Sequence, residues 1–187
     1  MLSELQKRKL TVVFNTYDTD GNGVLEEQDF VQRVAKVVAP RNAEPGSPTY
    51  DWAYNKWMKE WGRLQRLADV NQDNKVSLDE WFAFHERELQ LERPQLPYWR
   101  NPEEDGLTFT EFIFDIVDLD DNGKISWKEY SLFLHAYGID WDLHQEIFQK
   151  LDLNGDGVLS KDEWVVLLNQ FFGDDPDAPG NWHLGPY

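Results

Sequence analysis

Apolar residues recur at helical spacing on both sides of four short polar segments of this chain. In each case an aliphatic residue lies five positions before the segment, and an aromatic residue follows directly after it. Such spacing places one apolar stripe on each flanking helix, so the two helices around a segment can bury their stripes against each other. The aliphatic residues are Val13, Leu64, Ile113 and Ile147, and the aromatic residues are Phe30, Trp81, Tyr130 and Trp164.

Local signals for helix ends agree with this pattern. Ser77, Ser126 and Ser160 are each followed three residues later by Glu, which is the capping box that begins a helix. A long helix is expected over residues 50–67, after the Pro- and Gly-rich stretch 40–48. The pattern therefore predicts an all-α protein.

The four polar segments are each twelve residues long and share one arrangement of side chains. They are residues 18–29, 69–80, 118–129 and 152–163, hereafter the first to fourth loops. Oxygen-bearing side chains stand at the first, third, fifth and twelfth positions, and an apolar residue at the eighth is expected to pair with the partner loop in a short β contact. This ligand spacing resembles the calcium loop of an EF-hand.

The expected metal ligands follow from this spacing. They are side-chain oxygens, the backbone carbonyl of the seventh position and, in the first loop, the ninth-position carboxylate, which would act directly or through water. The residues are Asp18, Asp20, Asn22, Val24, Glu26 and Asp29; Asp69, Asn71, Asp73, Lys75 and Glu80; Asp118, Asp120, Asn122, Lys124 and Glu129; and Asp152, Asn154, Asp156, Val158 and Glu163.

The four loops match the calcium-binding pattern to different degrees, and we expect Ca²⁺ at three to four of them. The third and fourth loops match the pattern completely. The second has Asn74 where a sharp bend favours Gly, although Asn tolerates positive φ better than most residues. The first ends on Asp29 rather than Glu. Because the Asp side chain is one methylene shorter than Glu, it would offer the ion one oxygen rather than two. The first loop would then be six-coordinate, a geometry that suits Mg²⁺.

The acidic composition also favours cations as partners. The chain has 35 acidic against 18 basic residues and a formal net charge of −17, which disfavours nucleic acid and anionic membranes. No Cys is present, so thiolate chemistry is excluded. No apolar run reaches the length of a membrane span, and no secretory signal is visible. We therefore expect a soluble, cytoplasmic, monomeric protein that is not an enzyme.

Breaks between the helical patterns predict two pairs of hands in one compact body. The N-terminal pair is expected over residues 1–92 and the C-terminal pair over 107–172, joined by a Pro-containing linker at 93–106. Residues 173–187 form a non-helical tail that carries Trp182, Leu184 and Tyr187. We expect these apolar side chains to dock on the body of the protein.

The whole chain resembles the sarcoplasmic calcium-binding proteins and their relative calexcitin. The resemblance rests on the four loops, on the terminal stretches Leu5–Leu10 and Gly180–Gly185, and on Asp29. It implies a compact four-hand protein that buffers Ca²⁺ in the cytosol or, alternatively, a sensor that binds a protein target. With only two Met residues, the chain lacks the Met-rich groove of a promiscuous sensor.

A third interpretation is a small-molecule carrier or photoprotein of the coelenterazine type, which the fold also resembles. Photoproteins hold their luciferin with His residues on the first and last helices, and the corresponding segments here, 5–17 and 160–172, have none. Of the histidines present, His85 is expected in the core, His135 and His144 on helix surfaces, and His183 where it would help to latch the tail.

Overall fold

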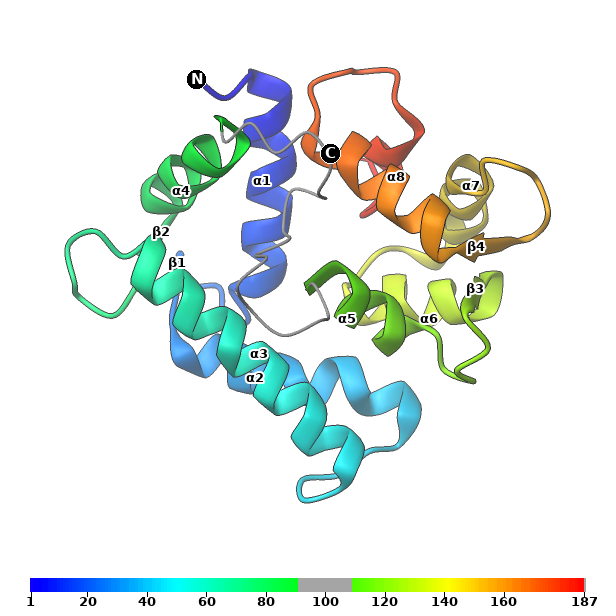
Figure 1. The fold of residues 1–187 in the computed structure, drawn as a ribbon, viewed down its shortest axis with the longest axis horizontal. Helices are drawn as coiled ribbons and strands as arrows, with labels where there is room; N and C mark the ends of the chain where they lie inside the picture. The colour runs from blue at the N-terminus through cyan, green and yellow to red at the C-terminus, as the bar shows by residue number, and fades with distance from the viewer. Residues whose placement is uncertain (91–108, 187) are drawn as a thin grey trace. The chain divides into compact units, whose positions relative to one another are not determined.

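The computed structural model describes residues 1–90 and 109–186, which fall in two compact units (Figure 1). The units comprise Met1–Pro94 and Gln95–Tyr187. Each contains four α-helices and one two-stranded antiparallel pair among its described residues. The mostly helical fold class with short β contacts is therefore confirmed. The expected linker at 93–106 and Tyr187 of the tail lie outside the described residues.

The N-terminal unit consists of two helix–loop–helix segments. Its elements are α1 (Glu4–Tyr17), β1 (Val24–Leu25), α2 (Glu27–Val38), the 3₁₀-helix η1 (Ala39–Arg41), α3 (Pro48–Leu67), β2 (Val76–Ser77) and α4 (Leu78–Gln90). Helices α2 and α3 pack along each other (Figure 1). The long helix expected over 50–67 is present and begins slightly earlier, because Ser47 caps it and Pro48 occupies its first turn.

The C-terminal unit repeats this arrangement and adds an ordered tail. Its elements are α5 (Phe109–Val117), β3 (Lys124–Ser126), α6 (Trp127–Ala136), α7 (Trp141–Leu151), β4 (Val158–Ser160), α8 (Lys161–Phe172) and the 3₁₀-helix η2 (Pro179–Trp182). Glu129 and Glu163 complete capping boxes with Ser126 and Ser160, as predicted. Ser77 and Glu80 exchange the same bonds in the N-terminal unit.

The eighth loop residues pair the loops of each unit, as expected from their apolar character. Leu25 lies opposite Val76, and Ile125 lies opposite Leu159, in antiparallel register. All four side chains are fully buried. Each two-stranded contact thus fixes one loop against its partner and draws the flanking helices around one core.

The aromatic residues that follow the loops form the centre of each core. Phe30 and Trp81 both lie within aromatic contact distance of Tyr17, with ring centroids 5.7 and 5.8 Å apart. In the C-terminal unit, Tyr130 and Trp164 lie 6.2 Å apart in an edge-to-face arrangement. All of these side chains are buried. Burial of one large apolar side chain contributes roughly 1.5–3 kcal/mol, so each aromatic residue that follows a loop stabilises the core of its unit by about this amount.

The tail packs closely on α8 and α7. Gly180 N–H donates to Gln170 Oε1 at 2.8 Å, and the Lys150 ammonium lies 4.4 Å from the centre of the Trp182 ring. Leu184 is buried, whereas Trp182 is partly exposed. Residues 178–185 therefore form part of the C-terminal core.

The side chains of His144 and His183 are both buried in the C-terminal unit. His144 was expected on a helix surface, and this is wrong. Its side chain is buried, with Nδ1 2.6 Å from Ser131 Oγ and Nε2 3.0 Å from the Ile139 carbonyl. His183 is buried against Trp164, at 4.6 Å between ring centroids, and the Tyr130 hydroxyl donates to its carbonyl at 2.6 Å. The Tyr130 hydroxyl oxygen also lies 3.4 Å from Nδ1 of the His183 ring, so each buried ring has a polar contact from another element.

Burial of His183 predicts a pH-dependent stability of the C-terminal unit. Desolvation lowers the pKa of His183 to about 3 from its ordinary 6.5. Between these values the unfolded chain binds the proton and the folded chain does not, so stability is full above pH 6.5 and declines as the pH falls toward 3. The decline contributed by one such histidine is about 1.4 kcal/mol per pH unit. We expect His183→Gln to reduce the slope by up to this amount, with the full reduction reached only below about pH 6 where the unfolded histidine is protonated, measured by urea unfolding between pH 7 and 5 in chelator.

The matched control for this experiment is His135→Gln, because His135 is exposed on α6. It should leave the slope of stability against pH unchanged. Baseline destabilisation of the His183 variant does not affect the result, since the slope alone is compared. An unaltered slope in His183→Gln would contradict the assigned pKa.

Candidate metal centres

Each predicted loop joins two helices of one unit and bends where the sequence requires. The sixth residues have positive φ, at 83° for Gly23, 80° for Gly123 and 84° for Gly157. Asn74 adopts the same bend at 63°, and its side-chain oxygen accepts a bond from Gln65 Nε2 at 2.8 Å. The second loop therefore reaches the shape of the others without glycine, because Asn tolerates the left-handed region.

The first aspartate of each loop holds the bend from inside. In the first loop, the N–H of Asn22 donates to Asp18 Oδ1 at 3.0 Å, and the N–H of Gly23 donates to Oδ2 at 2.8 Å. The same two bonds, from the fifth and sixth residues, occur in the other three loops. They involve Asp69, Asp118 and Asp152. Since one carboxylate accepts hydrogen bonds from two successive N–H groups, these bonds within the loop hold its backbone in a curled form.

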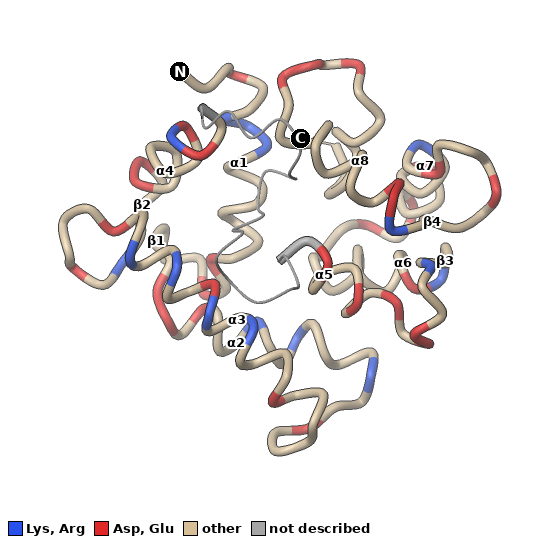
Figure 2. Tube along the Cα trace, viewed as in Figure 1, with Lys and Arg blue, Asp and Glu red and all other residues tan. Residues whose placement is uncertain are grey.

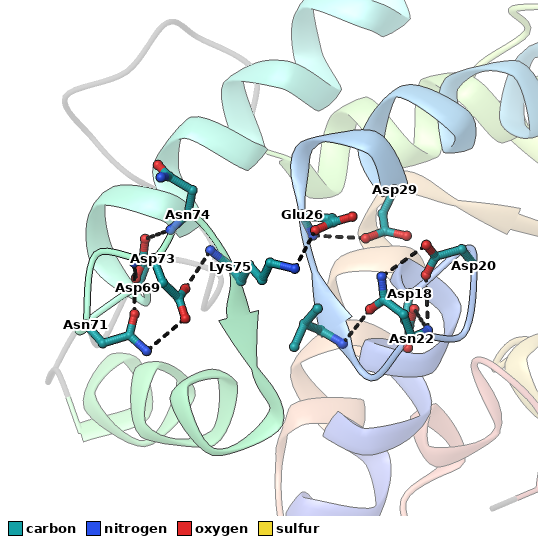
Figure 3. Close-up of polar contacts among 11 residues, drawn as sticks. Asp18, Asp20, Asn22, Glu26, Asp29, Asp69, Asn71, Asp73, Asn74 and Lys75 are labelled. Atoms are coloured by element: carbon teal, nitrogen blue, oxygen red, sulfur yellow. Dashed lines mark hydrogen bonds and ion pairs between the residues drawn. The ribbon is translucent and has the colours of Figure 1, made fainter.

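The third and fifth side chains are turned inward by a second repeated bond. The side-chain oxygen of each accepts the N–H of the residue two positions on, as in Asp20 with Asn22 at 3.0 Å and Asn22 with Val24 at 2.9 Å. Figure 3 shows these bonds in the first two loops. Equivalent bonds are present in the third and fourth loops. Four loops of different sequence thus share one backbone path with oxygens along its inner side.

The twelfth residue connects the end of each loop to its beginning. Glu129 Oε1 accepts the N–H of Leu119 at 2.8 Å, and Glu80 Oε1 accepts that of Val70 at 3.1 Å. In the first loop Asp29 Oδ1 accepts the N–H of Thr19 at 2.8 Å. In the fourth loop, Glu163 Oε1 is buried and accepts no hydrogen bond. A buried carboxylate oxygen without a donor is costly unless a cation or another group compensates it.

Carboxylate oxygens converge in the first and third loops. One oxygen each of Asp18, Asp20 and Asp29 lies within 4.8 Å of the other two, and the corresponding group in the third loop is Asp118, Asp120 and Glu129. The second and fourth loops also have three carboxylates at the ligand positions, but their amide, Asn71 or Asn154, stands at the third position rather than the fifth. Figure 2 shows the acidic residues of the loops in red.

Burial acts on the charges at these positions. Desolvation raises the pKa of Asp29 and of Asp118 above the usual aspartate range, and nearby carboxylates, Asp20 and Glu129 respectively, add to the rise. For Glu80, burial acts in the same direction, but bonds from Ser77 and Val70 outweigh it and the pKa is lowered. A bound cation would favour the ionised form at all three positions, because an opposite charge at close range stabilises a carboxylate.

The donor set fits a hard divalent cation. Every inward side-chain group is a carboxylate or amide oxygen, which suits Ca²⁺ and Mg²⁺ rather than metals that prefer sulfur or imidazole. The buried Glu163 Oε1, which accepts no hydrogen bond, is an atom that such a cation would compensate. The residues of the loops therefore fit the metals that their spacing predicts.

Two features of the loops were missed at the level of sequence. The fourth residue of each loop also has positive φ, at 71° for Gly21, 62° for Gln72, 56° for Asp121 and 72° for Gly155. The glycines at two of these positions were the available signal. In addition, the Glu26 carboxylate, expected to face the metal, lies 3.2 Å from Lys75 Nζ of the second loop (Figure 3).

Comparison with known families agrees with this geometry. An EF-hand family model matches residues 66–85, 111–134 and 144–168, and an EF-hand domain pair model matches residues 1–36. Each of the four loops lies inside one of these matched segments. The chain belongs to the EF-hand family and is a calcium-binding protein.

Several individual proteins are similar to this chain over most of its length. The 16 kDa calcium-binding protein of Schistosoma mansoni is 28% identical over 170 residues, covering 89% of this chain and 98% of the relative. The luciferin-binding protein of Renilla reniformis is 26% identical, covering 95% and 92%. The structure of a sarcoplasmic calcium-binding protein from amphioxus matches the complete fold with a TM-score of 0.79, at 18% identity and full coverage of both chains.

These relationships confirm the predicted resemblance and the absence of an enzymatic role. The EF-hand proteins that this chain matches over most of its length are calcium-binding proteins of the sarcoplasmic type, which are not enzymes. Within residues 1–90 and 109–186, no helix is both long and apolar enough to cross a membrane.

Proposed function

We propose that this protein is a Ca²⁺ buffer with a first site that also takes Mg²⁺. The observation that carries the proposal is the hydrogen-bonded path common to all four loops, in which the first, third and fifth side chains are already oriented. A loop that needs little rearrangement binds its ion with little ordering cost. Such a loop suits storage of the ion better than a large conformational response.

The ligands in this proposal are the residues that the spacing indicates. In each loop the first, third, fifth and twelfth side chains and the seventh carbonyl would hold the ion, whereas the ninth-position carboxylate of the first loop, Glu26, is paired with Lys75. The carbonyls are those of Val24, Lys75, Lys124 and Val158. The cation supplies positive charge that offsets the repulsion among the converging carboxylates of the first and third loops.

The packing of the tail supports a buffer over a sensor. A sensor opens the apolar face between its helices on binding Ca²⁺ and offers it to a target. In the C-terminal unit, His183 packs on Trp164 and Phe171, with ring centroids 4.6 and 6.0 Å apart, and Leu184 is buried. The tail thus occupies part of the surface that a target helix would need.

Two alternatives have support of their own. Trp127 and Trp141 are 45% and 51% exposed, which favours a sensor that binds a protein target through exposed aromatic side chains. Similarity to the luciferin-binding protein of Renilla favours a small-molecule carrier. A fluorescent probe of apolar surface separates the sensor from the buffer, because a large Ca²⁺-dependent increase is expected only for the sensor.

Calorimetric titration with Ca²⁺ tests the proposed sites. We expect three to four binding events, with one weakened by millimolar Mg²⁺, since the first loop ends on Asp29. Glu163→Gln should remove one event and leave the Mg²⁺-sensitive one intact, because the variant loses a charged ligand of the fourth loop. Asp29→Glu is the matched change in the first loop and should abolish the Mg²⁺ effect. Identical titrations with and without Mg²⁺ would contradict the mixed assignment.

A further inference from the structure

A charged pair links the two loops of the N-terminal unit. Glu26 is the ninth residue of the first loop, and Lys75 is the seventh residue of the second. Glu26 Oε2 lies 3.2 Å from Lys75 Nζ, and the side chains are 30% and 49% exposed. Figure 3 shows Lys75 extending from the second loop to the carboxylate of Glu26.

The strand register explains why these residues meet. In the antiparallel pair, Val24 lies opposite Ser77 and Leu25 opposite Val76. Extending this register by one residue places Glu26 opposite Lys75. Side chains directly opposite each other in an antiparallel pair are close enough for an ion pair.

The corresponding positions of the C-terminal unit carry no such pair. There the register places Lys124 opposite Ser160 and Ser126 opposite Val158. The lysine of the third loop thus faces a hydroxyl group, and the ninth-position residue faces an aliphatic one. The charged pair distinguishes the first and second loops from the third and fourth.

The ion pair involves the carboxylate at the ninth position of the first loop. Asp29 already accepts the N–H of Thr19 at 2.8 Å on one oxygen and that of Glu26 at 2.9 Å on the other. Ca²⁺ takes six to eight oxygens, whereas Mg²⁺ requires six in near-octahedral geometry. An extra oxygen from Glu26 would therefore help Ca²⁺ more than Mg²⁺.

We propose that Lys75 determines the metal preference of the first loop by holding Glu26 away from the ion. Withdrawal of this carboxylate keeps the first site at a low coordination number and favours Mg²⁺. Lys75 is then a specificity residue supplied by the neighbouring loop. The inference rests on the proposed function, because it takes the first loop to be a metal site.

The test compares Lys75→Met with Glu26→Gln, the double variant and Lys124→Met in the full-length chain. In Lys75→Met the Ca²⁺ affinity of the first site should rise about fivefold, the upper range for an exposed charge pair, and Mg²⁺ affinity should rise less. The gain should vanish in the double variant, because it depends on Glu26. Affinities are measured by calorimetry, and the amide resonance of Gly23 in NMR spectra reports occupancy of the first loop.

Lys124→Met controls for loss of a lysine charge at the seventh loop position. Its backbone carbonyl is retained, and Lys124 faces Ser160 rather than an acid. It should shift the Ca²⁺ and Mg²⁺ affinities of the partner fourth loop by equal factors. Unequal factors in Lys75→Met, together with equal ones in Lys124→Met, support the proposal.

Two negative outcomes are distinguishable. If Gly23 of the wild-type protein responds to Mg²⁺ or Ca²⁺ but the Lys75→Met gain persists in the Glu26→Gln background, a general charge effect explains it and the role of Glu26 is overturned. If Gly23 responds to neither ion in the wild type, the first loop is not a metal site and the proposed function fails at that loop.

Discussion

Removal of Ca²⁺ with a chelator is expected to lower the free energy of unfolding by about 2.7 kcal/mol for each site that was held at 100 times its Kd. The reason is that the ion binds the folded loop, whose carboxylates converge, and not the unfolded chain. With 35 acidic residues and a net charge of −17, the metal-free protein also retains uncompensated repulsion. Thermal unfolding followed by circular dichroism, with Ca²⁺ and with chelator, measures the difference.

Glu163→Gln provides the matched comparison for this experiment. The variant removes one charge from the fourth loop, where Glu163 Oε1 is buried and accepts no hydrogen bond. In Ca²⁺ it should be less stable than the wild type, whereas in chelator the two should be closer. A melting temperature that chelator leaves unchanged would exclude Ca²⁺ as a stabilising ligand.

Substitution of Gly180 by Ala is expected to destabilise the C-terminal unit by roughly 3 kcal/mol, the upper part of the usual range for overpacking. A Cβ at this position would overlap the Leu167 carbonyl oxygen and would lie 2.7 Å from Gln170 Cβ. Neither atom can move freely, because both belong to α8. The tail must therefore lift from the helix, which exposes Leu184 and His183. Urea unfolding measures the change.

Gly62→Ala is the control, for which the same substitution is expected to increase stability rather than decrease it. Gly62 lies inside α3, and a Cβ there would meet no heavy atom within 4 Å. Because Ala is a better helix former than Gly, this variant should be more stable by roughly 0.5–1 kcal/mol. If Gly180→Ala were as stable as the wild type, the close packing of the tail on α8 would be wrong.

Local chemistry accounts for how much of the loops could be predicted. Alternating oxygen-bearing side chains impose turns by bonding their own backbone, as Asp18 does with the N–H groups of Asn22 and Gly23. These bonds span five residues or fewer, so both partners lie within one short sequence motif and can be recognised together. The same holds for the capping boxes at Ser126 and Ser160. Asn74 could be expected to bend because its tolerance of positive φ is an intrinsic property.

Contacts between distant residues were beyond this reasoning. His144 appeared suited to a surface, but Ser131, on the neighbouring helix α6, provides a partner 2.6 Å away and allows its burial. Nothing in the spacing of residues 141–151 indicates that partner. The Glu26–Lys75 pair likewise requires the antiparallel register of two loops that are far apart in the chain.

The identity of the protein as a helical, four-loop calcium-binding chain was already encoded in short-range patterns. Ligand spacing, caps and apolar stripes act within one loop or one helix, and each can be recognised without knowing what lies opposite. The close approach of Gly180 to Leu167, the burial of His183 and the contact of Lys75 with Glu26 depend instead on folding. These features arise because packing brings together elements whose separation along the chain carries no information about their contact.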